Sequence, residues 1–125
     1  MLYNQKVLHY YQAIDDPKPL WKKDMPLVVS TTSGDKSSGE LVIFQVKADS
    51  NNSPIDARFQ VLGCGYMIAL VSWLSEKIVA GEFAKLENLT MQQLVDEFEL
   101  PKHKYHSAIC LLDICKQLSD VICVH

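Results

Sequence analysis

The chain is most constrained by a single cysteine set between two glycines, at the point where a strand pattern gives way to a helix pattern. Residues 55–61 alternate between apolar and polar side chains, which predicts a strand with one face on a core and one in water. The alternation ends at Gly63, Cys64 and Gly65, and an almost wholly apolar stretch begins at Tyr66. We therefore expect Cys64 on a tight turn at the N-terminus of a helix, where the helix dipole favours a thiolate.

Apart from a short amphipathic helix pattern at residues 3–13, strand patterns come first and helix patterns follow. β-Branched runs or alternating polarity predict three strands, at residues 27–32, 41–48 and 55–61. Short polar connections join them, so we expect a three-stranded antiparallel meander. Helical spacing then predicts helices at residues 66–81, 90–98 and 106–122, the second of them opened by a capping box. Strands followed by helices indicate an α+β fold, with the sheet packed against several helices.

Length and charge narrow the class of protein. The 125 residues suit a single domain, 1–125, with its own hydrophobic core. A formal net charge of −3 argues against a nucleic acid or an anionic membrane as the main partner. No apolar run approaches the roughly 20 residues of a membrane span, and the N-terminus lacks a secretory hydrophobic segment. We therefore expect a cytoplasmic protein whose remaining cysteines are free thiols that behave as small apolar residues.

Three polar residues stand at the ends of predicted elements. Asp35 falls in the polar turn after the first strand, Cys64 in the glycine turn, and His106 at the start of the last helix. Carboxylate, thiolate and imidazole are all ligands for zinc or iron. Their spacing along the chain does not by itself bring them together, so a shared site and separate structural roles are both open at this point.

The same segments carry a resemblance to a known family. They read Ser33-Gly34-Asp35, Gly63-Cys64-Gly65 and His106-Ser107-Ala108. In order and local context they resemble the C-G-D, G-C-G and H-C-S segments of the IscU/NifU-type iron–sulfur cluster assembly scaffolds. The resemblance covers nearly the whole chain and is weakest over residues 13–30. It implies the same α+β fold and a site formed by Asp35, Cys64 and His106.

The departures from the family pattern bear on what the site can hold. Ser33 and Ser107 stand where the family has its first and third cysteines. Iron–sulfur clusters are normally held by four thiolates, with occasional histidine replacement, and a serine oxygen is a harder ligand that is not ionised at neutral pH. The resemblance therefore implies an incomplete ligand set, suited to one zinc or iron ion with water, Ser33 or Ser107 in a fourth position, and puts an iron–sulfur cluster in doubt. Cys110 lies about 5 Å along the helix axis beyond Ser107, and we expect it to be too far to substitute.

A second segment resembles the family's recognition site for an Hsp70-type chaperone. It comprises Leu100, Pro101, Lys102, His103 and Lys104. Lys102 and His103 replace a proline and a valine, which removes backbone pre-organisation and an apolar contact, so weakened chaperone binding is one interpretation. The other is a simple break between two helices. The resemblance also implies a cysteine desulfurase as partner, and we expect a monomer or a weak dimer.

Three function classes follow. The first is a scaffold-like protein of iron–sulfur cluster assembly that binds a single ion. The second is a metal-free binding module or regulator that engages the desulfurase or another assembly partner. The third is an enzyme in which Cys64 is a nucleophile, His106 its base and Asp35 the orienting carboxylate. No oxyanion-hole or substrate signature accompanies these residues, so we expect a protein that is not an enzyme.

Overall fold

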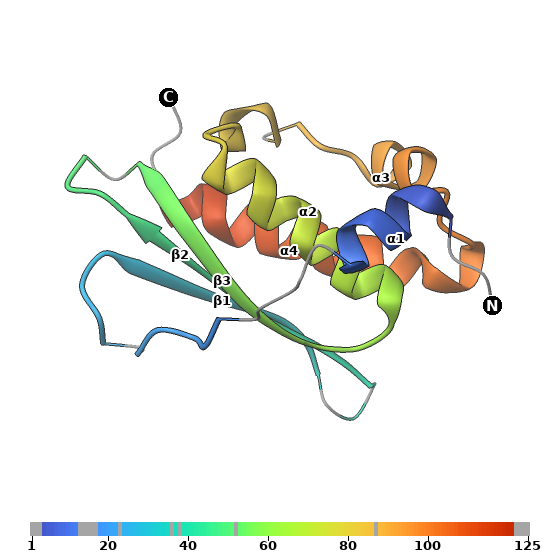
Figure 1. Ribbon diagram of the computed structural model, residues 1–125, viewed down its shortest axis with the longest axis horizontal. Helices are drawn as coiled ribbons and strands as arrows, with labels where there is room; N and C mark the ends of the chain where they lie inside the picture. Colours follow the sequence, from blue (N-terminus) through green and yellow to red (C-terminus); the bar gives the residue numbers. More distant parts are fainter. Residues whose placement is uncertain are drawn as a thin grey trace.

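The computed structural model has one three-stranded antiparallel sheet with helices packed against it (Figure 1). It describes residues 4–12, 18–22, 24–35, 37, 39–51, 53–86 and 88–121. The strands are β1 (Val28–Asp35), β2 (Glu40–Ala48) and β3 (Pro54–Leu62), in the order β1-β2-β3. The predicted meander is therefore confirmed, with β2 in the centre.

Helices occupy the N-terminus and the second half of the chain. They are α1 (Gln5–Gln12), α2 (Gly65–Val79), α3 (Met91–Phe98) and α4 (Tyr105–Val121), with short 3-10 turns η2 (Phe83–Leu86) and η3 (Lys102–Lys104). This confirms the predicted α+β class. The last residue predicted for the final helix, and the ends predicted for the first, lie outside the described residues. Within the described part of the chain, no helix has the length and apolar character needed to cross a membrane.

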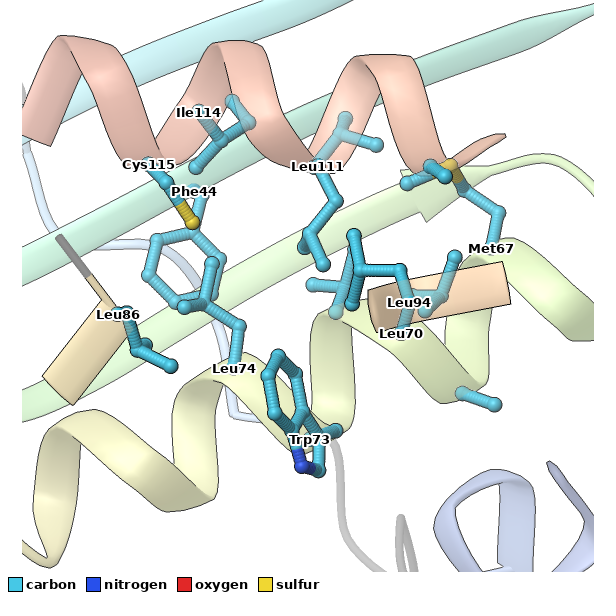
Figure 2. Close-up of a cluster of buried hydrophobic side chains, with 14 of the residues drawn as sticks. Phe44, Met67, Leu70, Trp73, Leu74, Leu86, Leu94, Leu111, Ile114 and Cys115 are labelled. Atoms are coloured by element: carbon cyan, nitrogen blue, oxygen red, sulfur yellow. The ribbon is translucent and has the colours of Figure 1, made fainter. Parts of the chain in front are cut away.

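The core lies between one face of the sheet and the helix pair α2 and α4, which run side by side in Figure 1. Inward-facing residues alternate along β2, so Val42, Phe44 and Val46 are fully buried. Figure 2 shows Phe44 with Leu74 of α2 and Ile114 of α4 in the same apolar cluster. The N-terminal ends of both helices lie at the end of the sheet where β2 begins, because Cys64, just before α2, and Ser107, in the first turn of α4, both hydrogen-bond to Glu40.

The hairpin between β1 and β2 differs from the sequence prediction. Residues 33–35 were expected in a polar turn, but β1 continues through Asp35, which pairs with Glu40. Gly34 makes this extension possible, since its φ is +85° and a Cβ there would lie 2.3 Å from the carbonyl oxygen of Glu40. The strand therefore carries Ser33 and Asp35 to the hairpin end of the sheet, on the same face as Glu40.

The opposite face of β2 is covered by the segment that precedes the sheet. The Gln45 side chain accepts a hydrogen bond from the Trp21 backbone N–H (2.7 Å) and donates one to the Trp21 carbonyl (3.1 Å). The Arg58 guanidinium lies 4.3 Å from the centre of the Trp21 ring and donates to the Pro19 carbonyl (3.0 Å). These contacts anchor residues 18–22 across the sheet, so the polar site described below lies on the helix side.

Candidate functional site

Three separate segments meet on the side chain of Glu40, the first residue of β2. Glu40 is 7% exposed. Its Oε1 accepts hydrogen bonds from Ser107 Oγ (3.2 Å) and Cys64 Sγ (3.6 Å), and its Oε2 lies 2.9 Å from His106 Nε2. A single carboxylate thus links β2, the turn between β3 and α2, and the first turn of α4. The sequence interpretation did not include Glu40.

Cys64 is the N-cap residue of α2, as the glycine turn predicted. Its backbone is extended (φ −88°, ψ 172°), its carbonyl accepts from the Ile68 N–H (3.1 Å), and its side chain makes no capping hydrogen bond. The half-buried thiol is directed to Glu40 instead. The position of Cys64 at a helix N-terminus is confirmed.

His106 and Ser107 occupy the first turn of α4. Ser107 is fully buried, so its hydroxyl depends on Glu40 for a hydrogen-bond acceptor. The His106 side chain is 54% exposed, so the imidazole reaches Glu40 from the solvent side. The two residues therefore approach the carboxylate from different directions.

Asp35 lies next to this group. It is the cross-strand partner of Glu40 in the register of β1 and β2, so both side chains project from the same face of the sheet. Its Oδ1 accepts hydrogen bonds from the Ser37 backbone N–H and hydroxyl, both at 2.6 Å. The structure thus brings Cys64, His106 and Ser107 onto Glu40, whereas the hydrogen bonds described for Asp35 stabilise the hairpin turn.

Ser33 and Cys110 form a second contact at the same end of the sheet. Burial raises the pKa of the Cys110 thiol, a hydrogen bond with the Ser33 side chain opposes that rise, and the negative charge of Glu40 adds to it. Ser33 is itself 8% exposed. The sequence argument expected Cys110 to lie too far along α4 to substitute for the missing cysteine, and the partner described for its thiol is Ser33.

The donor set does not fit an iron–sulfur cluster held by this chain at the predicted positions. Cys64 alone offers a thiol there, and the hydroxyls of Ser33 and Ser107 already make hydrogen bonds within the protein. In the described ranges, no group of three or more His, Cys, Asp or Glu side chains is arranged to hold a metal ion as it stands. The residue types around Glu40 are nevertheless those that bind single zinc or iron ions, namely thiol, imidazole and carboxylate.

The arrangement also bears on the predicted nucleophile and base. The contacts described for the Cys64 thiol and for the His106 imidazole both go to Glu40. Asp35, the predicted orienting carboxylate, accepts from Ser37. A carboxylate between thiol and imidazole does not provide the direct thiol-to-base hydrogen bond of an activated nucleophile.

The predicted chaperone segment connects α3 to α4. Leu100 is buried and Pro101 half-buried, whereas Lys102 and His103 are exposed in η3. The helix break is thus real, and the residues that depart from the family pattern face solvent.

A small antiparallel sheet, helices over one face and a carboxylate–thiol–imidazole group at the end of the sheet where β2 begins define an α+β protein with a polar side-chain cluster between strand and helix ends. The family model described as "NifU-like N terminal domain" matches residues 2–117, and the chain belongs to this family.

Curated relatives agree with the family assignment. The chain is 30% identical over 116 residues to the iron–sulfur cluster assembly scaffold protein IscU of Haemophilus influenzae, covering 93% of this chain and 91% of the relative. It is 28% identical over 118 residues to the scaffold protein IscU of Escherichia coli, covering 93% and 90%. The Drosophila melanogaster relative, named an iron–sulfur cluster assembly enzyme, is 28% identical over 115 residues, covering 92% and 74%.

Proposed function

We propose that this chain is a non-enzymatic, cytoplasmic component of iron–sulfur cluster assembly whose site binds a single zinc or iron ion. Family membership supports the general role, since the similar proteins are named for cluster assembly. The observation that supports ion binding is the position of Glu40, within hydrogen-bonding distance of both Cys64 Sγ and His106 Nε2. The thiol and the imidazole already share one carboxylate, and binding would require both side chains to rotate toward a common cation.

Each site residue has a distinct role in this proposal. Cys64 and His106 are the principal donors, because sulfur and imidazole nitrogen bind zinc and ferrous ions strongly. Asp35 and Glu40, paired across two strands, offer carboxylates, and binding would release Glu40 from one of its present partners. Ser33 or Ser107, or a water molecule, completes the coordination.

Zinc titration of metal-stripped protein tests the proposal. We expect calorimetry and elemental analysis to give one zinc per chain, with binding lost in Cys64→Ala and strongly weakened in His106→Ala. His103→Ala is the matched control, because it removes an exposed imidazole from the neighbouring turn η3. Absence of zinc binding, or binding that survives Cys64→Ala, would contradict the proposal.

The contacts that Glu40 makes within the protein also support a second candidate function, a metal-free binding module. Glu40 already accepts hydrogen bonds from Cys64 and Ser107 and lies 2.9 Å from His106 Nε2, so this end of the fold holds together without a cation. Two apolar side chains close in sequence to Cys64 and Ser107 are exposed, Leu62 at 51% and Ile109 at 56%, and a protein partner would cover them.

Association with a purified cysteine desulfurase separates the two candidates. A module would bind the desulfurase equally well with and without a chelator and would slow cluster formation on a three-cysteine scaffold. If the function depends on the bound ion, adding the chelator would change the association with the desulfurase. If the chain does not bind the desulfurase under either condition, the binding-module candidate is excluded.

Weak chaperone binding is proposed for residues 100–104. Lys102→Pro with His103→Val restores the two residue types of the family pattern and should strengthen binding to an Hsp70-type chaperone in a fluorescence titration. Unchanged affinity would leave the segment as a helix connection. Sedimentation should show a monomer or a weak dimer.

A further inference from the structure

We propose that the outer edge of β3 is a docking site for an extended, acidic segment of a partner protein, which pairs with β3 as a fourth strand. In the order β1-β2-β3, β3 is one of the two edge strands of the sheet (Figure 1). The site is formed by Phe59 and Val61 of β3, by residues 18–20 and by Ile68 of α2. It is separate from the group around Glu40, so it does not depend on the proposed ion.

The first argument is the direction of the backbone groups at the sheet edges. Thr32 of β1 is bonded to the Gln117 side chain through both its N–H (3.4 Å) and its carbonyl (2.9 Å), so its backbone faces away from β2. Along an antiparallel strand, the N–H and carbonyl groups of successive residues face alternate sides. The strand register carries this alternation across β2. On β3 it turns the backbone groups of Ala57, Phe59 and Val61 outward.

The second argument is which of these outward groups already have partners. The Ala57 N–H donates to the side chain of its neighbour Asp56 (2.9 Å), which agrees with the outward direction. In the part of the chain that the structure describes, the outward N–H and carbonyl groups of Phe59 and Val61 make no hydrogen bond. The edge of β1 is thus covered at Thr32 by a side chain, whereas the edge of β3 is open over Phe59 and Val61. An open strand edge can pair with another chain.

The third argument is the shape of the surface along this open stretch. A cavity of about 360 Å³ is lined by Phe59, Gln60 and Val61 of β3, Ile68 of α2, and Lys18, Pro19 and Leu20. Arg58 holds residues 18–20 in place by donating to the Pro19 carbonyl (3.0 Å). Because residues 18–20 cover one face of the sheet and α2 covers the other, the strand edge has a wall on each side. A groove of this kind accepts a peptide that adds a strand to the sheet.

The lining defines the chemistry of the occupant. Among the described residues that line the groove, Lys18 alone is charged; it is exposed, and no ion pair of Lys18 is found in the described ranges. The groove therefore suits apolar side chains together with an aspartate or glutamate placed to meet Lys18. A partner strand that pairs with both Phe59 and Val61 needs about three residues, since each adds roughly 3.4 Å.

The docking site adjoins the cluster around Glu40. Val61 precedes Cys64 by three residues, so their Cα atoms lie no more than about 11 Å apart. A partner segment on β3 is thereby held close to the Cys64 thiol.

A synthetic six-residue peptide tests the inference on the full chain. It carries alternating valine and threonine between terminal aspartates, and binding is followed by fluorescence anisotropy. We expect the peptide to bind, and lysines in place of the aspartates to weaken binding at low ionic strength. A copy that is N-methylated at every amide keeps the side chains but loses the donors, so it should not bind.

Two proline variants test the strand edge. Val61→Pro removes an outward N–H without removing a hydrogen bond to β2, as edge strands tolerate, and should weaken peptide binding about tenfold. Ser30→Pro is the matched control, because it removes an outward N–H from β1 at the opposite edge and should leave the peptide affinity unchanged.

Amide hydrogen exchange, measured by NMR, uses the unmodified protein in case Val61→Pro folds poorly. In the free protein, the amides of Phe59 and Val61 should exchange faster than those of Arg58 and Gln60, which face β2. Saturating peptide should slow the exchange of Phe59 and Val61. Exchange that the peptide leaves unchanged at these two positions would overturn the inference.

The remaining outcomes are equally decisive. If the peptide does not bind, or if the N-methylated copy binds as well, β3 does not take a partner strand. A dimer of this chain in sedimentation that Val61→Pro abolishes, with no peptide binding, would assign the edge to a second copy and overturn the partner segment.

Discussion

Replacing Glu40 with alanine should loosen the junction between the sheet and the two long helices. The substitution removes the acceptor of the fully buried Ser107 hydroxyl and the contacts to Cys64 and His106. A buried hydroxyl left without a partner costs about 1–3 kcal/mol. The His106 contact adds only about 0–1 kcal/mol because that side chain is 54% exposed.

Part of this loss is offset, because a buried carboxylate no longer has to be removed from water. We therefore expect the free energy of unfolding to fall by about 2 kcal/mol, which corresponds to a melting temperature lower by roughly 8 °C for a domain of this size. Glu40→Gln retains an acceptor oxygen for Ser107 and should lose about half as much.

The assay is urea unfolding followed by circular dichroism in buffer with a chelator, so that no ion contributes. Glu76→Ala is the matched control, because Glu76 is an exposed glutamate on α2. If Glu40→Ala is as stable as Glu76→Ala, the carboxylate does not link these segments and the description of the site is wrong.

Three further results are expected. Thr90→Ala removes the capping-box hydroxyl of α3 and should lower the free energy of unfolding by about 1 kcal/mol, while Thr90→Ser should be nearly neutral; equal losses would refute the cap. Gly34→Ala places a Cβ 2.3 Å from the Glu40 carbonyl oxygen at a φ of +85°, so both the free energy of unfolding and the zinc affinity should fall. Unchanged zinc affinity would show that the hairpin conformation does not affect the site. At pH 8 iodoacetamide should label Cys64 well before Cys115, because a pKa of about 12 leaves Cys115 with a thiolate fraction of roughly one in ten thousand; equal labelling rates in the folded protein would contradict this.

The fold could be predicted because its signals are local. The alternation along β2 and β3 fixes which residues face the core, and the glycine turn at Cys64 marks the change from strand to helix. The end of β1 could not be predicted this way. Polar residues and glycine indicate a turn, whereas pairing with β2 across the hairpin keeps residues 33–35 in the strand.

The site was predicted only in part, because its central residue, Glu40, belongs to no motif that the sequence alone would single out. Glu40 continues the inward-facing series of Val42, Phe44 and Val46 by one position, so a carboxylate at a core-facing strand position was the available clue. The distance argument for Cys110 considered displacement along one helix, whereas its partner Ser33 comes from a strand far away in sequence. Contacts between distant segments are not visible in residue spacing.

Anaerobic reconstitution with excess ferrous iron and sulfide tests the central claim most directly. After desalting, iron and acid-labile sulfide are counted per chain and the visible absorption is recorded. A site that holds a single ion predicts at most one iron per chain, no retained sulfide and no cluster absorption in the visible range. Retention of iron and sulfide in equal amounts, with stable visible absorption that Cys64→Ala abolishes, would show that this chain holds a cluster and would contradict the account.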